Sequence, residues 1–328
     1  MKPINAERIS TLMLQNTTLI LFVMIFLFFG IQSPRFLELE SISNIVKQAS
    51  FTGVVAVGMT FVLLTAGIDI SVGSNMYLSS LVAGLLFRDQ NFGVVAALLA
   101  ALVTGALLGA FNAFCIVRLR IIPFIVTLAT LVAGRGLGTV LTESVTLDFP
   151  QSILDFGHSK ILGLPMPIIV FTFVVILAYL VLTRTPFGRQ IYAVGNDVEA
   201  AKKAGINTGR VIALAYIISG VCAALGGFIL MSQIGRLDQQ YAAGEEFNVI
   251  AAAVLGGTSL FGGVGNAFGA VVGAVLVQMV QAGLVFNNVN LYLQPMVQAV
   301  IIFIAVFFDS LRGTRLARLK RRFIRTEA

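Results

Sequence analysis

Ten long apolar stretches, separated by short polar segments, leave this chain few ways to fold. They lie at about residues 12–31, 42–66, 72–87, 93–117, 122–142, 165–183, 210–232, 246–263, 267–286 and 292–310. A helix needs roughly 20 predominantly apolar residues to cross the hydrocarbon core of a bilayer. Such a span is helical because its backbone polar groups find no water there and must bond within the segment. Charged residues make up only 11% of the chain, whereas soluble domains have about 25%. The sequence therefore predicts one all-α polytopic membrane domain over residues 1–328, with about ten transmembrane helices.

Basic residues are unevenly distributed between the segments that join these stretches. If the N-terminus is cytoplasmic, 16 of the 22 Lys and Arg residues fall in cytoplasmic segments, seven of them in a basic tail at 311–328. Cytoplasmic loops carry such an excess, so we expect both termini on the cytoplasmic side of the membrane. A basic tail directly after a span suits anionic lipid headgroups, and nucleic acid is not an expected partner. The charges of the outside loops 143–164 and 233–246 are expected to be solvated.

A short charged segment at residues 184–206 separates two of the predicted spans. Within it, Asn196 and Glu199 have the N-x-x-E spacing of a helix capping box. Gly205 can end such a helix, because a residue without a Cβ adopts the left-handed conformation easily. We therefore expect a short cytoplasmic helix at about 196–205, capped by Asn196. It is either a simple connector or a surface presented to a partner.

Two glycine-rich breaks interrupt apolar sequence, at residues 67–73 and 256–265, and both end in Val-Gly. This is a weak sign of internal duplication. Irregular backbone survives at membrane depth only where protein or water satisfies its polar groups. The breaks are therefore candidates for re-entrant, pathway-lining or gating segments.

Glycine also recurs at the G-x-x-x-G spacing, in the pairs Gly105/Gly109 and Gly269/Gly273. In lipid this spacing lets two helix backbones approach closely. It predicts close helix packing and carries no information about a substrate.

The groups needed for catalysis or independent energy coupling are scarce. The chain has no G-x-x-x-x-G-K-[ST] motif for nucleotide phosphates and only one histidine. Its two cysteines lie in apolar runs, so neither a disulfide nor a metal site is predicted. Carboxylates inside the predicted spans are nearly missing, whereas proton-driven transporters usually display several. We therefore expect a transporter that is energised by another chain, with no catalytic site and no cofactor of its own.

Asp69 lies in the first break, and Arg135 is the only basic residue well inside a predicted span. An isolated charge at the bilayer centre costs about 2.5–3.5 kcal/mol on insertion scales, so each needs a partner. One possibility is that they pair with each other. The other, which we favour, is that Asp69 accepts hydrogen bonds from its own turn, from the amides of Ser71 and Val72.

Four segments carry a resemblance to a known family, namely GVVAVGMTFVLLTAGIDISVGS (53–74), IIPFIVTLATLVAGRGL (121–137), TPFGRQIYAVGNDVEAAKKAGI (185–206) and VLGGTSLFGGVGNAFGAVVGA (254–274). Together they closely resemble the membrane permease of bacterial ABC importers for monosaccharides such as ribose, galactose and arabinose, which implies a location in the bacterial inner membrane. The resemblance covers about residues 42–310, and the third segment is the most specific. The same family includes permeases for other small polar solutes, among them the autoinducer-2 signal.

The resemblance implies a type II importer-like permease with three partners: a second permease copy, a cytoplasmic ATPase and a periplasmic sugar-binding protein. ATP and Mg²⁺ would be bound by the ATPase. The charged segment would contact that ATPase, through Gly195, Asn196, Glu199, Ala200, Ala201, Ala204 and Gly205.

A neutral sugar needs hydroxyl and amide partners along its path. The candidates near the first break and in the fifth predicted span are Ser71, Asn75, Thr127 and Thr130. Ordinary hydrogen bonds between helices are an equally good interpretation of these four residues.

Two alternatives come from other classes of protein. One is a ten-span secondary transporter or channel for a small polar solute, which would need its own ion site or conducting pore. The other is a membrane subunit with no transport role. A neighbouring gene for an ATPase would favour the importer over both.

Overall fold

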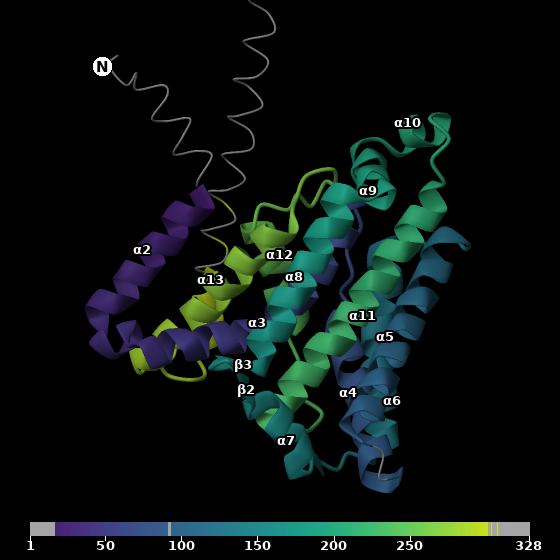
Figure 1. Ribbon diagram of the computed structural model, residues 1–328. Helices are drawn as coiled ribbons and strands as arrows, with labels where there is room; N and C mark the ends of the chain where they lie inside the picture. Colours follow the sequence, from purple (N-terminus) through teal and green to yellow (C-terminus); the bar gives the residue numbers. More distant parts are fainter. Residues whose placement is uncertain (1–16, 91–92, 301–302, 304–306, 308–328) are drawn as a thin grey trace, which may run out of the picture. The chain divides into compact units, whose positions relative to one another are not determined.

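The computed structural model describes residues 17–90, 93–300, 303 and 307, and it is predominantly helical (Figure 1). Its longer helices are α2 (Thr17–Gln32), α3 (Leu39–Leu64), α4 (Val72–Gln90), α5 (Val94–Val117), α6 (Pro123–Thr142), α8 (Met166–Arg184), α11 (Thr208–Ile234) and α13 (Ala267–Phe286). Shorter helical elements are η1 (Pro34–Leu37), α7 (Gln151–His158), α9 (Pro186–Asn196), α10 (Val198–Lys203) and α12 (Glu245–Leu255). Strands in these residues are two-residue pairs: β1 (Leu147–Asp148) with β4 (Arg236–Leu237), and β2 (Lys160–Ile161) with β3 (Leu164–Pro165).

The helices confirm an all-α polytopic membrane protein. Within the described ranges, six helices are long and apolar enough to cross a bilayer, namely α3, α5, α6, α8, α11 and α13. Shorter apolar stretches occur at Thr18–Gln32 in α2 and at Val72–Phe87 in α4. The first and last predicted spans, 12–31 and 292–310, lie partly outside the described residues, so the total of ten stays a prediction.

One predicted span is wrong as a continuous helix. The apolar stretch at 246–263 contains α12, which ends at Leu255 after 11 residues. At 1.5 Å per residue it is about 16 Å long, roughly half of a 30 Å hydrocarbon core. The helix ends just before Gly257, which has a positive φ angle of 89°, and Gly262 and Gly263 further along the break have φ angles of 87° and 70°. The second glycine-rich break therefore divides this apolar sequence between a half-length helix and α13.

The chain divides into two compact units, and the candidate site belongs to the second. Unit 1 comprises Met1–Ile45 and Val275–Ala328, and unit 2 comprises Val46–Ala274. In unit 1, the buried ring of Phe36 packs against Phe26, Phe29 and Phe286, with ring centroids 5.8–5.9 Å apart.

Unit 2 is organised around α4, which packs against α5, α6 and α11. The G-x-x-x-G pair of α5 lies directly on α11, because an added Cβ at Gly105 would collide with the carbonyl of Gly220 and one at Gly109 with that of Tyr216. From α4, the Asn75 amide donates to the carbonyls of Gly105 and Gly220, at 3.4 and 3.3 Å. The close packing predicted from the glycine spacing is confirmed here, and α5 and α11 lie side by side (Figure 1).

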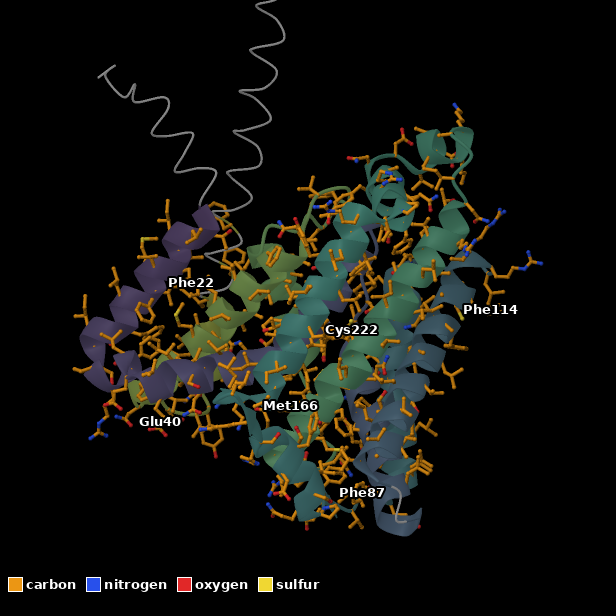
Figure 2. All side chains as sticks on the ribbon, in the orientation of Figure 1. Phe22, Glu40, Phe87, Phe114, Met166 and Cys222 are labelled. Carbon is orange, nitrogen blue, oxygen red and sulfur yellow. The ribbon has the colours of Figure 1, made fainter. Side chains whose placement is uncertain are left out.

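The outer face of this bundle is apolar. Phe114 points outward from α5 (Figure 2) and is 55% exposed, whereas Cys222 of α11 is buried. Lipid chains are the surroundings that such a face requires. Within unit 2, α9 and α10 lie at one end and α7, β2 and β3 at the other (Figure 1). The charged segment and the loop 143–164 are thus at opposite ends, while the choice of cytoplasmic end stays a prediction.

Candidate functional site

The charged segment folds into two helices, where the sequence predicted one. The second of them, α10, begins after Asp197, whose Oδ1 accepts hydrogen bonds from the amides of Glu199 at 2.9 Å and Ala200 at 3.0 Å. Asn196 is the last residue of α9, and its Nδ2 donates to the carbonyl of Tyr192 at 2.9 Å. The N-cap is therefore Asp197 and not Asn196, because Asn196 belongs to the preceding helix.

The end of α10 follows the prediction closely. Gly205 has a φ of 81°, and its amide donates to the carbonyl of Lys202 at 2.9 Å. The amide of Ile206 reaches back to the carbonyl of Ala201 at 3.0 Å. This pair of hydrogen bonds is the Schellman motif, which satisfies carbonyls that a helix end would leave open. A six-residue helix is thus closed at both ends by its own sequence.

The predicted contact residues differ in what they present to a partner. Glu199, Ala200, Ala204 and Gly205 are exposed, while Ala201 is only 4% exposed and packs against the rest of unit 2. A cavity of about 450 Å³ lies beside α10 and is lined in part by Lys202 and by Arg120 at the end of α5. The exposed side chains of α10 thus include the small Ala200 and the charged Glu199 and Lys202, which form an ion pair at 2.7 Å.

The first helix of the segment, α9, was missed in the sequence analysis. Thr185 caps it by accepting from the amide of Gly188 at 3.1 Å, and Pro186 occupies its first turn, where the missing N–H costs nothing. Ile191 and Val194 are fully buried on one face. The apolar residues three positions apart were the available signal for an amphipathic helix.

The last turn of α9 lies against the second glycine-rich break and against the end of α3, three residues before the first break. An added Cβ at Gly195 would lie 2.5 Å from the amide nitrogen of Gly263 and would collide with the carbonyl oxygen of Leu64. Gly263 donates from its amide to the same Leu64 carbonyl at 3.0 Å. The Tyr192 hydroxyl donates to the carbonyl of Gly265 at 2.7 Å. Three segments that are distant in the sequence therefore meet at one point.

In the first break, Asp69 accepts hydrogen bonds from its own turn, as we favoured, although the donors there belong to Ser71 and not to Val72. Its Oδ1 accepts from the amide of Ser71 at 3.1 Å and from the hydroxyl of Ser71 at 2.6 Å. Its Oδ2 accepts from the hydroxyl of Ser219 on α11 at 2.8 Å, a partner that the sequence analysis missed. Asp69 is 1% exposed, so these bonds replace the water that it would otherwise need.

Arg135 has partners other than Asp69. Its guanidinium donates to the carbonyl oxygens of Tyr241 and Ala242, the latter at 2.8 Å. It also lies over the ring of Tyr77, with Cζ 5.4 Å from the ring centroid, a cation–π geometry. Arg135 therefore holds the turn before α12 against α4 and α6, and the salt-bridge alternative does not describe this structure.

The four candidate pathway residues surround the first break, and all four are buried. Asn112 of α5 joins two of them, donating to the hydroxyl of Ser71 at 2.8 Å and accepting from the hydroxyl of Thr130 at 2.6 Å. Thr127 donates to the carbonyl of Ile68 at 3.3 Å. Asn75 bridges α5 and α11, as described above. Each of these positions thus makes a hydrogen bond to another segment, either a neighbouring helix or the break itself.

The acidic pair at the start of α12 is not solvated, contrary to the expectation for loop 233–246. Glu246 is 6% exposed. The carboxylate of Glu245 accepts hydrogen bonds from the hydroxyl of Thr52 and from the side-chain Nδ2 of Asn248, both at 3.1 Å. The turn that Arg135 holds directly precedes this pair, and it positions both side chains inside the protein. Among the residues that the structure describes, no group of three or more His, Cys, Asp or Glu side chains is placed to hold a metal ion.

Comparison with known proteins identifies the family. The family model described as "Branched-chain amino acid transport system / permease component" matches residues 41–306. The ribose import permease protein RbsC of Haemophilus influenzae is 31% identical over 313 residues, which cover 94% of this chain and 97% of that protein. The RbsC protein of Bacillus subtilis 168 is 37% identical over 284 residues, covering 85% and 88%. The D-allose transport system permease protein AlsC of Escherichia coli K12 is 33% identical over 297 residues, covering 90% and 91%.

No solved structure gives a significant match. The match of the family model over most of the chain agrees with the long apolar helices, the glycine-rich breaks and the capped helix between two spans. The chain is a multi-pass membrane protein that belongs to the family of transport-system permease components.

Proposed function

We propose that this chain is the membrane permease subunit of a binding-protein-dependent ABC importer that carries a monosaccharide across the bacterial inner membrane. The single observation that carries the proposal is the extent of similarity to permeases named for ribose and allose import, which spans 85–94% of the chain. The fold agrees, because a bundle with two broken segments offers backbone that can move at membrane depth.

ATP and Mg²⁺ would be bound by a separate cytoplasmic ATPase, which docks on α10. The exposed surface of α10 and its C-terminal turn combines small residues, Ala200, Ala204 and Gly205, with charged ones, Glu199, Lys202 and Lys203. Small side chains permit a helix to sit deeply in a groove of a partner, and the caps at both ends keep it rigid. A second permease copy and a periplasmic sugar-binding protein would complete the importer, with both termini of this chain in the cytoplasm.

An uptake experiment can distinguish the two substrate classes that the comparisons name, sugars and branched-chain amino acids. The family model refers to branched-chain amino acids, whereas the relatives are named for sugars. Cells that lack the gene should lose uptake of radiolabelled ribose or allose and regain it on complementation. Loss of leucine uptake with unchanged sugar uptake would contradict the proposed substrate class.

The docking surface is best tested at Ala200, because Ala201 is buried and a large side chain there would disturb α10 itself. Ala200→Trp should abolish sugar uptake and co-purification of the ATPase, while the permease still reaches the membrane. Ser152→Trp, at an exposed position of α7 at the other end of unit 2, is the matched control. Normal uptake by the Ala200 variant would exclude α10 as the ATPase contact.

A further inference from the structure

The joint between α9 and α10 is rigid. Asp197 is the only residue between the two helices, and its amide donates to the carbonyl of Ala193 in α9 at 3.1 Å. The same residue caps α10 with its carboxylate, and its carbonyl accepts from the amide of Ala201 at 3.0 Å. A displacement of α10 must therefore move the end of α9 with it.

The other end of α9 is also fixed. The ring of Phe187 stacks on that of Phe61 in α3, with centroids 6.3 Å apart and an angle of 12° between the planes. Between these two ends, Tyr192 and Gly195 contact the second break, and Gly195 also contacts Leu64 at the end of α3. The helix α9 is thus anchored on α3, joined to α10 and packed on the second break and on the end of α3 that leads into the first.

The contacts of α9 with the end of α3 and with the second break are made largely by backbone atoms. At Gly195 no side chain separates α9 from the Leu64 carbonyl and the Gly263 amide, which are hydrogen-bonded to each other. Closely packed backbone does not absorb a displacement as a flexible side chain would. Gly262, Gly263 and Gly265 have positive φ angles, so the second break contains backbone that can rotate where other residues would be strained.

We propose that α9 transmits the movement imposed on α10 to the second glycine-rich break directly, and to the first through the end of α3 that leads into it, with Tyr192 and Gly195 as its positioning residues. This inference rests on the proposed function, because it takes the ATPase as the source of the movement. When α9 shifts, the Leu64 carbonyl, the Gly263 amide and the Gly265 carbonyl shift with it. The first break, which leads into α4, and the second, which leads into α13, then change together.

The test separates ATPase docking from transport. The importer is reconstituted in lipid vesicles from this permease and from the ATPase and sugar-binding protein that are proposed as its partners. The readouts are ATPase co-purification, ATP hydrolysis and radiolabelled sugar moved per ATP hydrolysed. Tyr192→Phe removes only the hydroxyl that reaches Gly265, and its matched control is Tyr292→Phe, at a side chain that is 92% exposed in unit 1.

Tyr192→Phe should lower the sugar moved per ATP by about threefold to tenfold, the effect of losing one hydrogen bond on an equilibrium. ATPase co-purification should be unchanged. Gly195→Ala should lower the same ratio further, because its methyl group must displace the Leu64 carbonyl. Gly136→Ala is the matched control, since an added Cβ there meets nothing within 4 Å.

An unchanged ratio in Tyr192→Phe would overturn the inference, even if Gly195→Ala failed to fold. Loss of ATPase co-purification in Tyr192→Phe would also overturn it, since the hydroxyl would then serve docking and not transmission. If the unaltered permease binds no ATPase and moves no sugar, the proposed function itself fails. The two failures are therefore distinguishable.

Discussion

Replacing Asp69 should show how much the geometry of the first break depends on one carboxyl group. Asp69→Ala leaves three donors without their acceptor, namely the amide and hydroxyl of Ser71 and the hydroxyl of Ser219. A buried donor that loses its partner costs about 1–3 kcal/mol. Even at the low end, the loss is about 3 kcal/mol of folding free energy, a large part of the 5–15 kcal/mol typical of a protein domain.

Asp69→Asn should be much milder. Its side-chain oxygen can still accept the two bonds from Ser71, so the loss is about 1 kcal/mol. The two variants then differ by about 2 kcal/mol, which corresponds to roughly a 30-fold difference in the ratio of folded to unfolded protein.

The chain contains no Trp, so intrinsic fluorescence is a poor probe of its unfolding. We would fuse a fluorescent protein to the C-terminus, heat the detergent-solubilised permease and measure the fraction that remains monodisperse by size-exclusion chromatography. Asp148→Ala, at an exposed aspartate of β1, is the matched control and should behave like the unaltered protein.

Two results would refute this reasoning. One is equal loss in the Asn and Ala variants, which would mean that the charge of Asp69 matters and not its acceptor geometry. The other is recovery in the double variant Asp69→Arg with Arg135→Asp. That recovery would show that Asp69 and Arg135 form a salt bridge in the membrane, whereas the structure gives each of them other partners.

Three further predictions concern orientation and packing. On a cysteine-free background, Ser152→Cys should react with an impermeant thiol reagent in intact cells, and Lys203→Cys only after permeabilisation; the reverse pattern would invert the topology. Gly109→Leu should abolish accumulation of the permease in the membrane, because its side chain would occupy the space of the α11 backbone, whereas Gly136→Leu should accumulate normally; equal amounts of both would contradict the close α5–α11 contact. Arg135→Gln should lower thermal stability by about 1–3 kcal/mol in the same size-exclusion assay, since it leaves carbonyls of the turn before α12 without a donor; an unchanged transition would contradict the role assigned to Arg135.

The features that depend on nearby residues were predictable from the sequence. Long apolar stretches became helices because the need to satisfy backbone polar groups in lipid applies to each segment separately. Gly205 was identified as the end of α10 because a left-handed residue after a short helix is a local requirement. The spacing of Gly105 and Gly109 predicted close packing for the same reason, although it did not indicate which helix lies opposite.

The choice between adjacent residues was not predictable in the same way. Asn196 and Asp197 can both cap a helix, and only the presence of α9 assigns Asn196 to the preceding helix. The burial of Glu246 likewise depends on the turn that Arg135 holds. Neither competition is visible in the local pattern of polar and apolar residues.

Partners that lie far away in the sequence were beyond prediction altogether. Ser219 and Asn112 have mainly apolar neighbours in the sequence, and nothing in their neighbourhood indicates that they meet the first break. The same holds for the junction of Gly195 with Leu64 and Gly263. Backbone atoms of Leu64 and Gly263 make that contact. Because these atoms are common to all residues, the sequence does not indicate which residues Gly195 will meet.

The hydrogen bonds of the first break also set the order of events during synthesis. Asp69 and Asn75 find partners in Ser219 and Gly220, which are 150 and 145 residues further along the chain. At 5–20 residues per second, the ribosome needs roughly 8–30 s to cover that distance. Throughout that interval the nascent α3–α4 segment contains a carboxyl group and an amide whose partners in α11 do not yet exist. We therefore expect chains truncated after Arg184 to be degraded faster than chains truncated after Leu255, a difference that pulse-chase labelling would measure.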